Sequence, residues 1–210
     1  MVENALRIGS SERGLLVGQT RTGKSTLANY LIQTKPVLLV IDPKGDFQLN
    51  RKAVTISNPN QLHNTKEPVI HYQPSPEYSD YSDYDDVFRW VFYRGNTFVY
   101  VDELTAVTGR TAQSYPIWLR SLYTQGAGKG IGVLAATQRP ANLPLFVFSE
   151  SFRFWAFFLL LERDNKRMAE YMGDVVLRRH HDTHSFFFRD ILVHRPAAEY
   201  VLNLSHTGKS

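Results

Sequence analysis

Short apolar runs recur along the chain, separated by segments in which apolar residues have a helical spacing. Four of the runs contain few polar side chains, and each is followed directly by a glycine, an aspartate or a glutamine. These runs are residues 15–17, 37–41, 97–101 and 131–137. Continuous apolar runs of this length are typical of parallel strands that are covered on both faces. We therefore expect these runs to form a parallel sheet, with a fifth strand over residues 153–162.

Helices are predicted between these strands, and antiparallel strands after them. Four helices are predicted. The first follows residue 24, and the second runs from Asp83, as its N-cap, to Gly95. The third begins near Pro116 and ends at Gly126, and the fourth spans residues 164–172. Residues 50–82 are less regular, with a short strand expected over 53–56. Near the C-terminus, strands are expected at 185–188, 191–194 and 199–202, with Arg189 and Asp190 in a turn. The predicted fold class is α/β, with a central, mostly parallel sheet flanked by helices and short antiparallel strands near the C-terminus.

The length and composition predict one domain. The chain has 210 residues, of which 43% are hydrophobic and 21% charged, which suits one well-buried α/β domain and is short for two. We expect a single domain over residues 1–210, with a core at 14–162 and a C-terminal extension at 163–204. The longest uninterrupted apolar run, residues 154–161, is far too short to cross a bilayer as a helix, and the N-terminus has no signal-peptide pattern. These features favour an intracellular, cytoplasmic protein.

Residues 18–26 carry the phosphate-binding pattern G-x-x-x-x-G-K-[ST] between an apolar run and a helical segment. Glycines let the backbone N–H groups point inward, and the helix N-terminus adds partial positive charge. Lys24 is expected to bridge the β- and γ-phosphates of a nucleoside triphosphate, and Ser25 to bind Mg²⁺. The alternative is a turn that only caps the helix, which the strand, loop and helix context disfavours. The candidate nucleotide-binding residues are Gly18, Gln19, Thr20, Arg21, Thr22, Gly23, Lys24, Ser25 and Thr26.

Two adjacent carboxylates, Asp102 and Glu103, follow the apolar run at 97–101. Triphosphate hydrolysis needs one carboxylate for the Mg²⁺ shell and a second to orient or polarise the attacking water. Taken alone, an apolar run followed by Asp-Glu is more often a solvated loop. Its place downstream of a phosphate loop favours the catalytic interpretation.

Two more strand ends carry polar residues. Gln138 follows the run at 131–137, where an uncharged amide could contact the γ-phosphate or hold the water. The alternative is an amide that satisfies backbone groups. Residues 42–47 follow the run at 37–41, at the edge where α/β proteins bind ligands, and the alternative there is a turn with solvated charges.

The charge distribution gives a weaker indication of a partner. The net charge of +4 and a pI near 9.3 lean toward anionic partners such as nucleic acid. Acidic residues gather in 77–86 and basic ones in 163–195, so a DNA-facing surface is expected in the second region. His180, His181 and His184 lie there without a carboxylate or thiolate to complete a metal site, so they are expected to be solvated or to face DNA.

The order of these motifs resembles the FtsK/HerA superfamily of DNA-pumping ATPases. The resemblance rests on four segments: residues 18–26, Asp42-Pro43-Lys44-Gly45-Asp46, Val99-Tyr100-Val101-Asp102-Glu103, and residues 130–140, which end in Thr137-Gln138-Arg139-Pro140. Chromosome translocases of that superfamily carry extra domains for which 210 residues leave no room. The chain therefore most resembles the genome-packaging ATPases of tailless icosahedral viruses with an internal membrane.

That resemblance implies a P-loop ATPase of the RecA/ASCE type that uses ATP and Mg²⁺ and forms a homohexameric ring on double-stranded DNA. It also implies a location in the host cytoplasm and docking at a capsid vertex or on a membrane protein. The implied roles are Lys24 on phosphate, Ser25 and Asp102 on Mg²⁺, Glu103 as the water-activating residue and Gln138 as the sensor. An arginine from a neighbouring subunit is implied as well; Arg153 is favoured over Arg139 and Arg120 because it begins the fifth strand.

Other functions remain as alternatives at this point. A conjugation or phage-secretion ATPase of the same superfamily would share every motif. A small-molecule phosphotransferase would share the phosphate loop, but no arginine-rich lid segment stands out between Asp102 and Gln138. A guanine-nucleotide switch needs an N-K-x-D element, and residues 164–167 have the wrong order.

Overall fold

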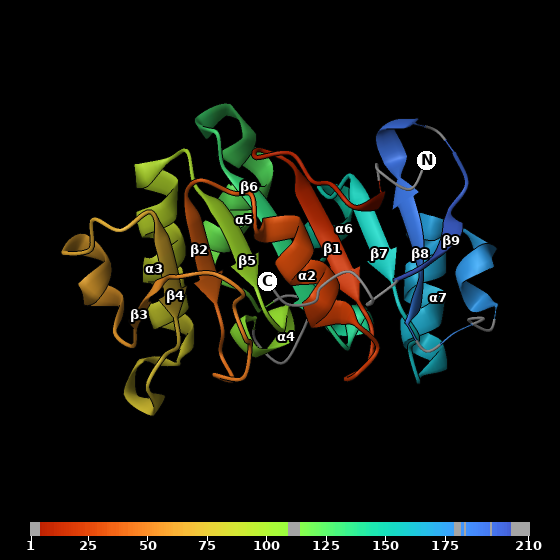
Figure 1. The fold of residues 1–210 in the computed structure, drawn as a ribbon, viewed down its shortest axis with the longest axis horizontal. Helices are drawn as coiled ribbons and strands as arrows, with labels where there is room; N and C mark the ends of the chain where they lie inside the picture. The colour runs from red at the N-terminus through yellow and green to blue at the C-terminus, as the bar shows by residue number, and fades with distance from the viewer. Residues whose placement is uncertain (1–4, 109–113, 179–181, 183, 194, 203–210) are drawn as a thin grey trace, which may run out of the picture.

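A nine-stranded sheet organises the part of the chain that the computed structural model describes, residues 5–108, 114–178, 182, 184–193 and 195–202 (Figure 1). The strands lie in the order β3-β4-β2-β5-β6-β1-β7-β8-β9, parallel from β3 to β7 and antiparallel from β7 to β9. This arrangement confirms the predicted fold class. The strands are β1 (Arg13–Val17), β2 (Leu38–Ile41), β3 (Val54–Ile56), β4 (Val69–Tyr72), β5 (Phe98–Val101), β6 (Gly132–Thr137), β7 (Arg153–Ala156), β8 (Ser185–Asp190) and β9 (Ala198–Val201).

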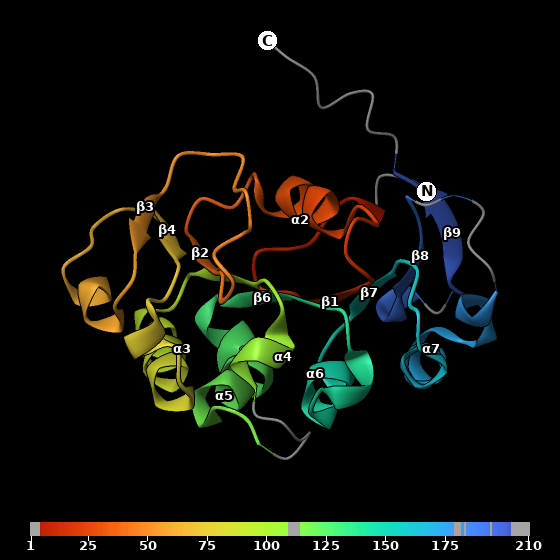
Figure 2. The ribbon, with the colours of Figure 1, turned by 90° about the horizontal axis from the view of Figure 1, so that it is seen from below.

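Helices cover both faces of the sheet. Figure 2 shows α2 over one face and α3, α5, α6 and α7 over the other. Successive strand residues point to opposite faces, so Leu16 of β1 packs in the cluster that includes α2, while Leu15 and Val17 pack in the cluster that includes α3. The helices are α2 (Lys24–Ile32), α3 (Tyr81–Arg94), α4 (Leu104–Val107), α5 (Ile117–Gln125), α6 (Leu145–Ser149) and α7 (Glu162–Met172).

The register of the parallel strands brings their carboxyl ends to one edge. Val17 is level with Thr137 of β6 and Ala156 of β7, and Ile41 is level with Val101 of β5. The segments that follow β1, β2, β5 and β6 therefore meet, and these are the four segments that carry the sequence motifs.

Four local predictions need correction. The strand β4 was not predicted, because it is only four residues long and contains His71. The N-cap of α3 is Asp80, whose carboxylate accepts from the backbone N–H groups of Ser82 and Asp83, so the helix begins before the predicted cap at Asp83. The fifth strand stops at Ala156 instead of residue 162. Residues 191–193 form a 3₁₀ turn, and Arg189 and Asp190 belong to β8.

Close packing around β6 gives a test of the fold. A Cβ on Gly132 would lie 2.5 Å from the carbonyl oxygen of Ser10 and 2.6 Å from a ring carbon of Phe98. Gly132→Ala is therefore expected to lower the free energy of unfolding by about 1–3 kcal/mol, measured by urea unfolding followed by circular dichroism. The control is Gly128→Ala, where a Cβ meets no heavy atom within 4 Å. Equal stability of the two variants would contradict the packing described here.

Candidate active site

The phosphate loop runs from the end of β1 into α2 and is held on both sides by neighbouring strand ends. The N–H of Gly18 donates to the carbonyl of Thr137 at 3.1 Å, and the N–H of Gln19 donates to the carbonyl of Phe158 at 2.9 Å. Gly23 has φ 98°, in the left-handed region that favours glycine, and immediately precedes the helix. This geometry leaves Lys24 buried and Ser25 exposed in the first turn of α2.

A pocket of about 330 Å³ opens above this loop. Because the strand ends meet here, one cavity contains the phosphate lysine, both predicted carboxylates and the predicted sensor. The lining residues are Gln19, Thr20, Arg21, Gly23, Lys24, Ser25, Thr26, Lys44, Asp46, Phe47, Asp102, Glu103, Gln138 and His184.

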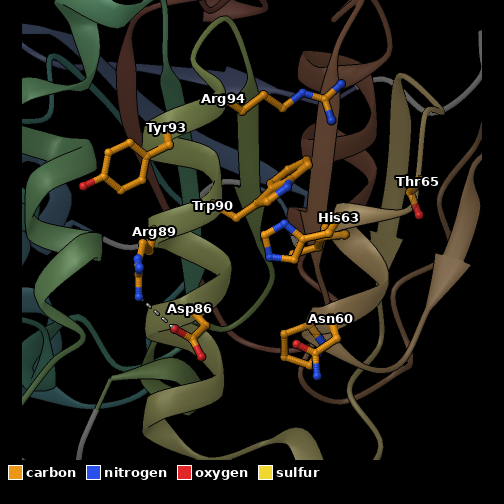
Figure 3. A pocket seen from close by; sticks show the side chains of 10 residues that line it. Asn60, His63, Thr65, Asp86, Arg89, Trp90, Tyr93 and Arg94 are labelled. Carbon is orange, nitrogen blue, oxygen red and sulfur yellow. Dashed lines mark ion pairs between the residues drawn. The ribbon is translucent and has the colours of Figure 1, made fainter.

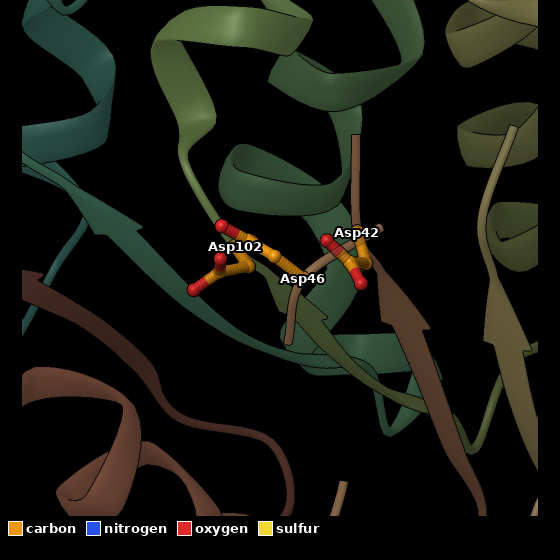
Figure 4. Close-up of side chains that lie close together, drawn as sticks. All are labelled: Asp42, Asp46 and Asp102. Atoms are coloured by element: carbon orange, nitrogen blue, oxygen red, sulfur yellow. The ribbon is translucent and has the colours of Figure 1, made fainter. Parts of the chain in front are cut away.

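Asp102, at the end of β5, is a buried carboxylate suited to a cation. Burial raises the pKa of Asp102 above its ordinary value, and the hydrogen bond from Tyr100 (2.6 Å) and the charge of Lys24 offset that only in part. Oxygens of Asp42, Asp46 and Asp102 lie within 4.8 Å of one another (Figure 4). Of these, Asp46 and Asp102 line the pocket together with the Ser25 hydroxyl, and oxygen donors of this kind fit Mg²⁺.

Glu103 is held by the strand next to its own. Its Oε1 accepts from the hydroxyls of Thr137 (2.7 Å) and Thr105, and its Oε2 lies 3.6 Å from Nζ of Lys44. Its backbone has φ 68° and ψ 73°, a left-handed conformation that non-glycine residues seldom adopt. Burial alone would raise the pKa of Glu103, but the two hydroxyls together with Lys44 and Lys24 lower it below its ordinary value. The side chain is therefore a carboxylate at neutral pH.

Asp42 orders the turn after β2. It is fully buried and accepts from the N–H groups of Gly45 (2.9 Å) and Phe47 (3.1 Å). Its Oδ2 also lies 3.2 Å from Nε2 of His71 and 3.1 Å from Nε2 of Gln73. Burial works against the charge of Asp42, but these partners lower its pKa below the ordinary value. Asp42 thus anchors the turn that carries Lys44 and Asp46.

The candidate arginines do not gather at this pocket. Arg153 stands at the amino end of β7, level with Gly14, and so lies at the opposite edge of the sheet from the phosphate loop. Its guanidinium pairs with Glu12 (2.8 Å) and Asp190 (3.5 Å) of the same chain. Arg139 follows β6 on the pocket side and lies 3.3 Å from Asp164. Arg120 is exposed on α5, where it forms no ion pair with the described residues.

Four pocket residues, Lys44, Asp46, Phe47 and His184, had no role assigned from the sequence. Lys44, Asp46 and Phe47 were recognised only as part of the segment that follows a strand. His184 was expected to be solvated or to face DNA, but the hairpin of β8 and β9 places it against the phosphate loop, with a ring carbon 3.4 Å from where a Cβ of Gly23 would lie. No local pattern could have found this contact, because it depends on the antiparallel extension of the sheet. His180 and His181 lie outside the described residues.

A second cavity, of about 660 Å³, lies between the 3₁₀ turn at Pro59–His63 and α3, away from the strand ends (Figure 3). Its charged side chains are already partnered within the cavity. Arg94 lies over the Trp90 ring at 4.8 Å, and Arg89 pairs with Asp86 at 4.0 Å. None of the sequence motifs contributes to it.

The sheet order, the glycine-bounded loop and the paired carboxylates define a P-loop nucleoside triphosphatase fold. Similarity to particular proteins narrows the class. The chain is 28% identical over 167 residues to the DNA packaging ATPase P9 of Enterobacteria phage PRD1, covering 77% of this chain and 70% of that protein. No protein-family profile matches it.

Solved structures share the fold at low sequence identity. The genome packaging NTPase B204 of Sulfolobus turreted icosahedral virus 2, in complex with sulfate, superposes with a TM-score of 0.77 at 15% identity, over 95% of this chain and all of that one. The pCW3 conjugation coupling protein TcpA gives a TM-score of 0.62 at 12% identity, over 91% of this chain and 60% of that one. The comparisons confirm the resemblance to viral packaging ATPases of the FtsK/HerA type.

Proposed function

We propose that this protein is an ATPase that moves double-stranded DNA, and that it packages a viral genome into a preformed capsid. The observation that carries the proposal is the pocket, in which Lys24, the pair Asp102 and Glu103, and Gln138 converge from the ends of β1, β5 and β6. The similarity to P9 of PRD1 over 77% of the chain supports the packaging role.

The proposed chemistry assigns one task to each side chain. The phosphate loop, residues 18–26, holds the triphosphate through its N–H groups, and Lys24 contacts the β- and γ-phosphates. Ser25 and Asp102 would hold Mg²⁺, which supplies charge neutralisation on the phosphates. Glu103 orients and polarises the attacking water, and Gln138 contacts the γ-phosphate or that water.

DNA contacts are proposed on the basic C-terminal region. Arg163, Lys166 and Arg178 are exposed there. Lys166 forms an exposed pair with Glu162 at 2.7 Å. Arg167 packs over the Phe148 ring at 4.5 Å, and Arg189 donates to the carbonyl of Tyr171 at 2.6 Å, so those two are less exposed and have structural partners. Phosphate-directed contacts of this kind bind duplexes with little regard to sequence.

The assembly is proposed to be a homohexameric ring in the host cytoplasm, docked at a capsid vertex or on a membrane protein. Among the described helices, none has the length and apolar character needed to span a bilayer. Within the ring a neighbouring subunit would offer an arginine to the pocket. We rank Arg120 first, because Arg139 pairs with the buried Asp164 and Arg153 pairs with Glu12 and Asp190 of the same chain. Arg139 is placed ahead of Arg153 because it lies on the pocket side of the sheet.

A conjugation or secretion ATPase is the second candidate, favoured by the superposition on TcpA. A small-molecule phosphotransferase is less well supported, because the carboxylate at Glu103 suits water activation.

The test is stimulation of ATP hydrolysis by nucleic acid. Duplex DNA of unrelated sequences is expected to raise the rate similarly and more than single-stranded DNA, and the apparent affinity should fall steeply between about 50 and 200 mM salt because contacts to backbone phosphates release counterions. Preference for single strands would favour the conjugation-type alternative. Strong discrimination among duplexes would contradict a translocase.

A further inference from the structure

Lys44 brings a second lysine of the same chain into the nucleotide pocket. It lines the pocket together with Lys24, but comes from the turn after β2 and its side chain is 43% exposed. The proposed function leaves it without a task. Its charged partner in the structure is Glu103, 3.6 Å away.

The two oxygens of Glu103 have different surroundings. Oε1 is taken by the hydroxyls of Thr105 and Thr137, which keep it in place on the β6 side. Oε2 faces Lys44 and is therefore the oxygen available to a water once Lys44 leaves. The contact is longer than a hydrogen bond, and the Lys44 side chain is 43% exposed although Glu103 is buried. The ammonium therefore keeps part of its hydration and is open to a stronger anion that enters the pocket.

Hydrogen bonds hold the turn that carries Lys44, while the Lys44 side chain extends from it partly exposed. Asp42 accepts from the N–H groups of Gly45 and Phe47, on the C-terminal side of Lys44, and is itself buried against His71. The lysine backbone is therefore anchored beside the pocket. The four-carbon side chain can redirect its ammonium by rotation alone.

We propose that Lys44 responds to the γ-phosphate: without nucleotide its ammonium neutralises Glu103, and with ATP it turns to the γ-phosphate and frees Oε2 of Glu103 for the attacking water. This inference rests on the proposed ATP site. It makes Lys44 a cation that distinguishes ATP from ADP, supplied by the same chain as the phosphate loop.

The test compares Lys44→Met with Lys44→Arg and with Lys66→Met, a matched change at an exposed lysine outside the pocket. Dissociation constants for ATPγS and ADP are measured by calorimetry. If the contact is charge-assisted, Lys44→Met should weaken the binding of ATPγS by about 10- to 100-fold and change the affinity for ADP by no more than about twofold. Lys44→Arg should keep most of the preference for ATPγS over ADP. Lys66→Met should change neither constant, and thermal unfolding should be the same for all three.

A second arm asks whether Lys44 contacts the phosphate or only neutralises Glu103. Lys44→Met is repeated in the Glu103→Gln background, where the carboxylate that pairs with Lys44 is absent. The proposal requires that ATPγS still bind more weakly there. If the effect vanishes in that background, Lys44 does not move to the phosphate and the inference is overturned.

Two other results would also overturn it. One is an unchanged ratio of ATPγS to ADP affinity in Lys44→Met, and the other is a loss of both affinities together with a lower unfolding temperature, which would mean a purely structural role. Failure of the proposed function looks different: the unaltered chain would then show no DNA-stimulated hydrolysis, whatever the binding ratios are.

Discussion

Lys24→Ala is expected to lose ATP turnover together with most nucleotide affinity, whereas Glu103→Gln should bind ATP and hydrolyse it about 10²- to 10⁴-fold more slowly. Lys24 is buried at the start of α2 and lines the pocket proposed to hold the phosphates, so its removal is expected to affect binding itself. Glutamine keeps the shape of Glu103 and can still meet the hydroxyl of Thr137, but it cannot accept a proton from water. Equilibrium binding and single-turnover hydrolysis measure the two effects separately.

Lys52→Ala, at an exposed lysine outside the pocket, serves as the control and should match the unaltered chain in both assays. The assignment of Glu103 would be wrong if Glu103→Gln turned over at the parent rate. The assignment of Lys24 would be wrong if Lys24→Ala bound and hydrolysed ATP normally.

Mixed rings are expected to recover activity that neither parent variant has. An arginine finger stabilises the charge that develops on the γ-phosphoryl group, and this raises the rate of hydrolysis by about 10³- to 10⁵-fold. Glu103→Gln subunits keep their arginines, and Arg120→Ala or Arg139→Ala subunits keep their carboxylates. Combining the two kinds creates interfaces with both intact halves, and ATPase activity measured across mixing ratios should pass through a maximum.

Arg153→Ala is the informative third variant of that series. Because Arg153 pairs with Glu12 and Asp190, its loss is expected to lower stability rather than to be complemented across an interface. If Arg153→Ala folds normally and is the variant that mixing rescues, Arg153 is the arginine supplied by the neighbouring subunit, as the sequence predicted, and the ranking drawn from its ion pairs is wrong. If mixing rescues none of the three although mixed oligomers form, the shared-site proposal fails.

Sequence patterns could predict the parts of the site that sit directly after apolar strands. Residues 18–26, Asp102, Glu103 and Gln138 all follow such runs, and parallel strands bring those ends together without further information. This is why the fold class and these residues of the pocket could be predicted from the sequence.

The rest depends on contacts between distant segments. The ion pair of Lys44 with Glu103 joins the ends of β2 and β5, and neither residue has a local pattern that reveals it. The strand β4 was missed because His71, buried against Asp42, interrupts its apolar character. Arg153 was chosen for its position at a strand start, yet a strand start lies at the edge opposite to the site in a parallel sheet.

The backbone of Glu103 also bears on how this chain could be redesigned. A left-handed conformation costs a non-glycine residue about 1–2 kcal/mol, and at φ 68° and ψ 73° a glycine would avoid most of that cost. Glycine would also remove the acceptor of the Thr105 and Thr137 hydroxyls, and leaving a buried hydroxyl without its acceptor costs about 1–3 kcal/mol. The contacts that hold the carboxylate therefore also offset its backbone strain, so a stabilised scaffold built from this protein should keep Glu103 together with Thr105 and Thr137.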